Sequence, residues 1–132
     1  MTDLKVLIVD DNDLIHFLHK EVLEISDLSQ NPIIFFNGKV ALDFLKNSRE
    51  SDGIFLVLLD LDMPIMNGFK FLENISGLSN TDNIHVAVVS STIDQEAKKK
   101  TFEFPNSIDF LEKPLTVTDC EKLKQRLLLN RN

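Results

Sequence analysis

Carboxylate side chains follow directly after two short apolar runs of this sequence. The pair Asp10-Asp11 comes after Lys5–Val9, and Asp60 comes after six apolar residues, Ile54–Leu59. Each run has the length and the flanking turn residues of a strand buried on both faces. If the two strands are neighbours, three carboxylates share a small volume, and their repulsion predicts a cation between them. Oxygen ligands suit a hard divalent ion, so Mg²⁺ is the predicted cofactor.

A hydroxyl and an amine follow two later apolar runs. Ser90 comes directly after His85–Val89, and Lys113 lies just beyond Ile108–Leu111. In a parallel sheet these groups reach the same edge as the carboxylates, where Lys113 supplies a positive charge and Ser90 a hydrogen bond. A metal, an amine and a hydroxyl around one carboxylate form an arrangement suited to phosphoryl transfer. Asp60 is the predicted nucleophile, and an aspartyl phosphate is the predicted product.

Amphipathic segments separate the expected strands. One more strand, the second in chain order, is predicted over Ile33–Phe36. The expected helices begin after Asp10-Asp11, at Asn37-Gly38 and after Gly68, and they also cover Asp94–Thr101 and Thr116–Asn130. Asn67-Gly68 offers the positive φ that a tight turn after Asp60 needs. Strands alternating with helices predict an α/β fold, in which a parallel sheet carries helices on both faces.

The hydrophobic pattern of each helix predicts which face turns inward. On the first helix, Leu14, Leu18, Val22 and Ile25 form one apolar stripe, while His16, His19 and Lys20 lie on the opposite face. We therefore expect the two histidines to be solvated, although their spacing could also bind a metal. The residues expected to point inward on the second and last helices are Val40, Ala41, Phe44, Leu45, Cys120, Leu123, Leu127 and Leu128.

Length and composition predict one soluble domain over residues 1–132. Apolar residues make up 43% of the chain and charged residues 27%, as in ordinary globular proteins. The net charge of −7 argues against non-specific binding to nucleic acid or anionic lipid. No apolar run is long enough for a membrane span, and the N-terminus lacks the pattern of a signal peptide. The lone Cys120 fits a reduced thiol in the core, so a cytoplasmic location is expected.

The sequence resembles the receiver domain of two-component response regulators over nearly its whole length. Four features occur in the family's order: the acids Asp10-Asp11, the motif Asp-x-x-Met-Pro-x-Met-x-Gly at Asp60–Gly68, the pair Ser90-Ser91, and Lys113-Pro114. Each feature alone is weak, but their combination on successive strand ends is specific. The resemblance implies the flavodoxin-like (βα)5 fold, a doubly wound five-stranded parallel sheet of order 2-1-3-4-5.

The resemblance also assigns roles to the site residues. Asp60 would accept a phosphoryl group from a histidine kinase or a histidine phosphotransfer protein. Mg²⁺ would be held by Asp11, Asp60 and the backbone carbonyl of Asp62, with Asp10 acting through water. Lys113 would bind a phosphoryl oxygen, as the residue pattern also predicts.

Two positions correspond to the family's conformational switch. Ser90 would be the hydroxyl that moves toward the phosphoryl group, where Thr is commoner, and Ser91 is the small residue beside it. Phe110 holds the aromatic position that is more often Tyr. Because Phe110 has no hydroxyl, its part in a switch must depend on packing. The Lys113-Pro114 bond would be cis, which X-Pro bonds permit.

The predicted function is that of a stand-alone receiver, a signalling protein and not an enzyme. With no output domain, it would act as a switch or phosphorelay intermediate and bind its target through the face of the fourth helix, fifth strand and fifth helix. One alternative is a haloacid-dehalogenase-like phosphatase, because Asp60-Leu61-Asp62 also matches that family's Asp-x-Asp. That motif normally lies on the first strand, however, and this short chain lacks a cap domain. A receiver-like module that is never phosphorylated is disfavoured, because every expected site residue is present.

Overall fold

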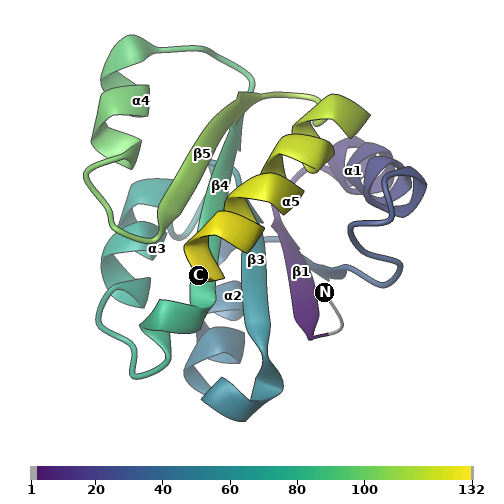
Figure 1. Cartoon of the computed structure of the whole chain (residues 1–132). Coiled ribbons are helices and arrows are strands. Elements are labelled where there is room, and N and C mark those ends of the chain that lie inside the picture. The colour runs from purple at the N-terminus through teal and green to yellow at the C-terminus, as the bar shows by residue number, and fades with distance from the viewer. Residues whose placement is uncertain (1–2, 132) are drawn as a thin grey trace.

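Within residues 3–131, which the computed structural model describes, parallel strands form one central sheet (Figure 1). The strands are β1 (Leu4–Val9), β2 (Ile33–Phe35), β3 (Ile54–Leu59), β4 (Ile84–Ser90) and β5 (Ser107–Glu112). They lie in the order β2-β1-β3-β4-β5, and all neighbouring pairs are parallel. This arrangement confirms the predicted flavodoxin-like fold and its strand order.

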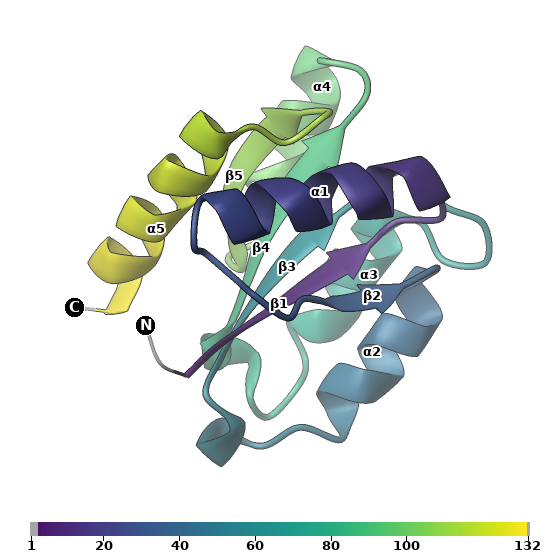
Figure 2. The ribbon, with the colours of Figure 1, turned by 90° about the vertical axis from the view of Figure 1, so that its right-hand side faces the viewer.

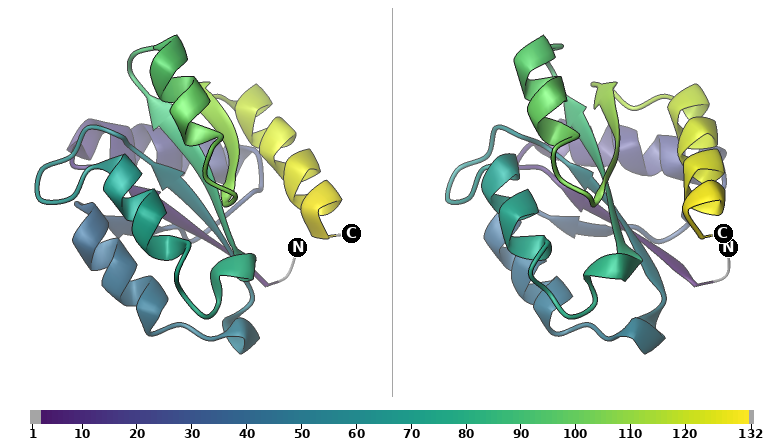
Figure 3. Two further views of the ribbon diagram at one scale, coloured as in Figure 1. Left: turned by 90° about the vertical axis from the view of Figure 1, so that its left-hand side faces the viewer. Right: turned by 60° about the vertical axis from the view of Figure 1, so that its left-hand side comes forward.

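Helices cover both faces of the sheet (Figures 2 and 3). One face carries α1 (Asp13–Ile25) and α5 (Val117–Arg131), and the other carries α2 (Gly38–Lys46), α3 (Gly68–Ile75) and α4 (Gln95–Thr101). Short 3-10 turns, η1 (Glu50–Asp52) and η2 (Thr81–Asn83), precede β3 and β4. None of the helices within the described residues has both the length and the apolar sequence needed to cross a membrane.

The apolar core is divided by the sheet into two layers. Val6 and Ile8 of β1 belong to the layer under α1 and α5, together with Cys120. Leu7 and Val9 belong to the layer under α2 and α3. Successive residues of a strand point to opposite faces, so a strand covered on both sides must be apolar throughout.

The strand register brings the carboxyl ends of the central strands together. Val9 of β1 pairs with Leu59 of β3, so the next residues, Asp10 and Asp60, leave the sheet side by side. At the end of β4, Ser90 pairs with Glu112 of β5, which directly precedes Lys113. The topology therefore delivers the predicted site residues to one edge of the sheet.

An irregularity in β5 accounts for the polar residue inside this strand. Val86 pairs with Ser107 and Ala87 with Asp109, so Ile108 is an extra residue of a β-bulge. The Asp109 carboxylate is buried and accepts a hydrogen bond from the backbone N–H of Phe110 at 2.8 Å. This polar residue of β5 therefore provides an acceptor inside the strand.

The buried face of α1 is not the one that the sequence predicts. His16, His19 and Leu23 turn inward, whereas Leu14 and Ile25 of the expected stripe are 63% and 71% exposed. Apolar residues lie on nearly every side of this helix, so periodicity alone does not select the inner face. Both histidine rings meet hydrogen-bond partners inside, which offsets the cost of burying them.

Two other helical residues also lie on a different face from the predicted one. Val40 of α2 is 51% exposed and Leu128 of α5 is 55% exposed, although both are expected to point inward. The adjacent residues Ala41 and Leu127 are buried in the two core layers. A shift of one residue along a helix turns a side chain by about 100°, which is enough to move it from the core to the surface.

The turn after β3 takes its positive φ at an unexpected residue. Ile65 has φ of 72°, while Asn67 has φ of −74° and caps α3 by accepting a hydrogen bond from Lys70 N. Gly68 is instead required for space, because a Cβ atom there would lie 2.8 Å from the Asp60 carbonyl oxygen. The prediction that Asn67-Gly68 supplies the positive φ is therefore wrong.

Candidate functional site

Three carboxylates converge where β1 and β3 end. One oxygen from each of Asp10, Asp11 and Asp60 lies within 4.8 Å of the others. The backbone continues the sheet pattern here, since Asp60 N donates to Val9 O at 3.0 Å. Asp10 and Asp60 are buried, whereas Asp11 is exposed. The site therefore has two acids set into the sheet edge and a third at its rim.

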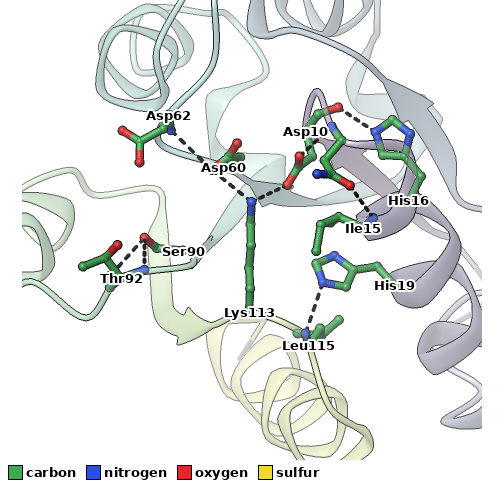
Figure 4. Close-up of polar contacts among 11 residues, drawn as sticks. Asp10, Ile15, His16, His19, Asp60, Asp62, Ser90, Thr92, Lys113 and Leu115 are labelled. Atoms are coloured by element: carbon green, nitrogen blue, oxygen red, sulfur yellow. Dashed lines mark hydrogen bonds and ion pairs between the residues drawn. The ribbon is translucent and has the colours of Figure 1, made fainter.

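The Lys113 amine bridges the two buried acids (Figure 4). Its Nζ lies 2.8 Å from Asp10 Oδ2 and 3.3 Å from Asp60 Oδ1. The backbone N–H of Lys113 donates to Ser90 O at 2.8 Å, which anchors this segment to the end of β4. The Lys113-Pro114 bond is cis, as predicted. All four strand ends named in the sequence analysis thus contribute to one edge.

Burial and neighbouring charges shift the pKa values at this edge. Burial and the nearby Asp10 charge raise the pKa of Asp60 above its usual range, although Lys113 opposes them. Burial acts to lower the pKa of Lys113, but its hydrogen bond to Asp10 and the charges of Asp10 and Asp60 outweigh burial and raise it. The amine therefore stays charged at neutral pH and partly neutralises the two acids.

Backbone N–H groups hold both buried carboxylates in position. Asn12 N donates to Asp10 Oδ1 at 2.9 Å, and Asp62 N donates to Asp60 Oδ1 at 3.3 Å. The Asn12 side chain also caps α1 by accepting a hydrogen bond from Ile15 N. Asp62 is exposed at the rim, and Figure 4 shows its side chain pointing away from the cluster. These contacts orient the acids without using the side chain of Asp62.

The hydroxyl of Ser90 is engaged within its own loop. Ser90 Oγ donates to Thr92 O at 3.0 Å and accepts from Thr92 N at 3.2 Å. Figure 4 shows this pair apart from the contacts of Lys113 and Asp60. Ser91 is exposed beside it, and Phe110 is buried among the core residues under α2 and α3. Ser90 thus lies at the predicted edge but makes no hydrogen bond to the acids in this conformation.

Two residues that contact the site segments were predicted to face solvent. His16 Nε2 lies 2.6 Å from Asp10 O, and His19 Nε2 accepts a hydrogen bond from Leu115 N at 3.1 Å. Their spacing to Leu23 on α1 is the pattern that could have identified this face. The alternative apolar stripe on the same helix obscured it.

The donor set fits a hard divalent cation. Asp10, Asp11 and Asp60 offer carboxylate oxygens, and no nitrogen or sulfur ligand belongs to the described cluster. Such a set suits Mg²⁺, which prefers oxygen ligands and keeps several waters. Asp11 is the exposed member, so a hydrated ion can reach the cluster from solvent. The arrangement can therefore hold a cation next to a carboxylate that a positive amine also contacts.

Comparison with known proteins gives a consistent result. A family model described as response regulator receiver domain matches residues 6–127. A protein-glutamate methylesterase/protein-glutamine glutaminase of Clostridium acetobutylicum is 31% identical over 97% of this chain, but the match spans only 36% of that protein. Two-component response regulator 24 of Arabidopsis thaliana is 30% identical, with 94% of this chain and 84% of that protein covered. The crystal structure of a two-component response regulator from Cytophaga hutchinsonii has a TM-score of 0.87 at 21% identity, covering 96% of this chain and 97% of that one.

Proposed function

The chain belongs to the response regulator receiver domain family, and from this premise we propose that Asp60 is the acceptor of a signalling phosphoryl group. The observation that supports this choice most directly is the position of Asp60. It is the buried acid at the end of the central strand β3, where it contacts both the Lys113 amine and the backbone N–H of Asp62. A nucleophilic carboxylate needs such fixed positive and hydrogen-bonding groups around it.

In the proposed reaction, a carboxylate oxygen of Asp60 attacks the phosphorus of a phosphohistidine on a histidine kinase or phosphotransfer protein. The new O–P bond forms as the N–P bond breaks, and the electron pair of that bond stays on the imidazole nitrogen. Lys113 neutralises a phosphoryl oxygen, and Asp62 N continues to orient the attacking carboxylate. A small phosphodonor with an acyl phosphate can replace the phosphohistidine, with its carboxylate as the leaving group.

The acidic cluster is the proposed Mg²⁺ site. Asp11, Asp60 and the backbone carbonyl of Asp62 would hold the ion, with Asp10 acting through water. When bound, Mg²⁺ supplies charge that neutralises phosphoryl oxygens. The chain's own part is to keep the acids close, since their oxygens already lie within 4.8 Å of one another.

Ser90 and Phe110 are the proposed switch residues. Ser90 Oγ would leave Thr92 and donate to a phosphoryl oxygen, which releases the loop after β4 from two hydrogen bonds. Phe110, on the neighbouring strand β5, would follow by repacking, because it has no polar group to bond. The face formed by α4, β5 and α5 would then change its affinity for a downstream protein.

Relatives with further activities do not extend this proposal. The region shared with the Clostridium methylesterase is the receiver domain, so its esterase activity is not carried over. The family match over residues 6–127 also removes the reason to prefer a haloacid-dehalogenase-like phosphatase. The proposal is accordingly a signalling role rather than catalysis on other substrates.

Intact mass spectrometry tests the proposed acceptor. The protein is incubated with Mg²⁺ and acetyl phosphate, and we expect the mass to increase by one phosphoryl group. Asp60→Asn should abolish the increase, while Asp62→Asn, a matched change at an exposed acid two residues away, should retain it. Phosphorylation that persists in Asp60→Asn contradicts the assignment. Turnover of a phosphomonoester without any adduct would instead indicate a phosphatase.

A further inference from the structure

Two buried histidines of α1 have no part in the phosphoryl chemistry proposed above. His16 is 6% and His19 is 2% exposed. Their rings point from the same side of the helix toward two different chain segments of the site (Figure 4). Burying an imidazole ring costs free energy unless the ring has a hydrogen-bond partner. The hydrogen-bond partner of each ring therefore shows which chain segment that ring holds in place.

His19 is hydrogen-bonded to the segment that carries the Lys113 amine. Its Nε2 accepts a hydrogen bond from Leu115 N at 3.1 Å, although the two residues lie 96 positions apart in the sequence. Leu115 follows Pro114, so it is only two residues from Lys113. On the other side, Lys113 N donates to Ser90 O at 2.8 Å. The segment is thus held by β4 before the proline and by α1 after it.

The hydrogen-bonding role of Nε2 in each ring follows from its partner. A backbone carbonyl can only accept, so His16 Nε2 carries the hydrogen that it donates to Asp10 O at 2.6 Å. A backbone N–H can only donate, so His19 Nε2 carries no hydrogen and the ring is neutral. Burial lowers the pKa of His19 to about 4, with the charge of Asp10 opposing this shift, which keeps the ring in the accepting form at neutral pH.

One helix therefore contacts the two chain segments that carry Asp10 and Lys113, the partners of the ion pair. His16 reaches the end of β1 at Asp10, and His19 reaches the loop after β5 at Leu115. The Lys113 amine lies 2.8 Å from Asp10 Oδ2. A flexible lysine side chain keeps such a short contact only if its backbone is fixed relative to the acid.

We infer that His19 is a positioning residue for phosphoryl transfer: by holding the backbone after Lys113, it sets where the amine rests between Asp10 and Asp60. The inference rests on the proposed function for its consequence in the reaction, but not for the geometry itself. His19 does not contact the phosphoryl group. Its effect passes through Lys113, and this indirect action distinguishes it from a residue that only stabilises the fold.

The test compares two substitutions of the same buried residue. His19→Leu keeps an apolar side chain of moderate size but removes the acceptor, whereas His19→Gln keeps an oxygen acceptor near the position of Nε2. With acetyl phosphate and Mg²⁺, we expect His19→Leu to lower the maximal phosphorylation rate roughly ten- to a hundredfold. The half-saturating concentrations of donor and Mg²⁺ should stay the same. His19→Gln should recover most of the rate.

A double-mutant cycle separates positioning from general destabilisation. In a Lys113→Met background there is no amine to misplace, so His19→Leu should cause no further loss of rate. Leu127→Ala, a cavity in the core at the far end of α5, should lower the melting temperature without changing the rate of the folded protein. Equal losses from His19→Leu with and without the amine would overturn the inference, as would a failure of His19→Gln to restore the rate.

A second measurement does not depend on phosphorylation. An ammonium group held by carboxylates should exchange its protons slowly, and NMR of ¹⁵N-labelled Lys113 measures this exchange rate. We expect at least tenfold faster exchange in His19→Leu and near-normal exchange in His19→Gln. If the wild-type protein gains no phosphoryl group but these exchange rates differ as stated, the proposed function fails and the positioning role stands. Unchanged exchange in His19→Leu refutes the positioning role in either case.

Discussion

Lys113 makes its shorter contact with Asp10, at 2.8 Å, and a longer one of 3.3 Å with the proposed acceptor Asp60. One amine thus contacts two buried carboxylates, and its single positive charge cannot fully neutralise both. A divalent cation at the same edge would supply the missing charge. Lys113 and Mg²⁺ are therefore expected to support the same carboxylates, and removing one should increase the protein's dependence on the other.

Lys113→Met tests this relationship by leaving both acids without the amine. Breaking a buried ion pair from one side is costly, so we expect the metal-free protein to lose on the order of 3–5 kcal/mol of unfolding free energy. Mg²⁺ should restore more stability to the variant than it adds to the wild type. Urea denaturation with EDTA and with Mg²⁺ measures both effects. Lys122→Met is the control, because Lys122 is half exposed and 4.0 Å from Asp109, and it should change the free energy by less than about 1 kcal/mol.

Asp11→Asn should weaken Mg²⁺ binding with little cost to the fold. Asp11 is exposed, and its removal takes one like charge out of the cluster. The melting temperature of the metal-free protein should therefore rise slightly, while the further increase caused by Mg²⁺ should become much smaller. Asp13→Asn changes a nearby exposed acid outside the cluster and should respond to Mg²⁺ like the wild type. An unchanged Mg²⁺ response in Asp11→Asn would exclude Asp11 as a ligand.

His19 should make the protein less stable in mild acid. Its pKa is lowered from 6.5 to about 4 by burial, so above pH 6.5 the ring is neutral in both the folded and the unfolded chain. Between pH 6.5 and 4 only the unfolded chain binds the extra proton, and the unfolding free energy should fall by up to about 1.4 kcal/mol per pH unit. His19→Gln lacks this contribution. Denaturation curves from pH 7 to pH 4.5 should show a shallower loss for the variant, and parallel losses would contradict the shift.

Much of the sheet could be predicted because buried parallel strands leave a clear pattern. Each appears as an apolar run, and the polar residues after the runs must meet at one edge, whatever the details of the helices. Asp10, Asp60 and Lys113 accordingly lie together as expected. Their register along the strands confirms that topology, rather than any local feature, creates the site.

The inner face of α1 could not be predicted in the same way. The partners that make burial of His16 and His19 acceptable are a carbonyl at the end of β1 and an amide 96 positions away. No local pattern reports such partners, and the apolar residues Leu14 and Ile25 favoured the wrong face. The bond between Ser90 and Thr92 was hidden for a similar reason, since it depends on the path of one loop.

Asp109 should stabilise the fold more through its hydrogen bond to the Phe110 N–H within β5 than through its ion pairs. One of its oxygens accepts from the buried Phe110 N–H at 2.8 Å, and the other accepts from Arg126 Nε at 3.0 Å. Asp109→Ala removes this buried acceptor of the Phe110 N–H, so we expect a loss of about 2 kcal/mol in urea denaturation. Arg126→Leu removes a half-exposed partner and should cost less than about 1 kcal/mol. The reverse ranking would show that the link to α5 dominates.

Ile65 should be a position where substitution stabilises the protein. Its φ of 72° lies in the left-handed region, which a β-branched side chain adopts only at a cost. The side chain is 76% exposed, so little packing is lost when it is replaced. Ile65→Asn, which tolerates this backbone, should raise the unfolding free energy by about 1 kcal/mol.

Ile93→Asn provides the matched control for this prediction. Ile93 is also an exposed isoleucine, at 55%, in the loop after β4, but its φ is not positive. Removing an exposed isoleucine without relieving backbone strain should leave the unfolding free energy within about 0.5 kcal/mol of the wild type. Because Ile65 lies in the turn between Asp60 and α3, the phosphorylation rate should be measured on the same samples. A stabilised Ile65→Asn with a slower rate would show that the strained turn contributes to the reaction, whereas equal stability changes at both positions would show that the strain is negligible.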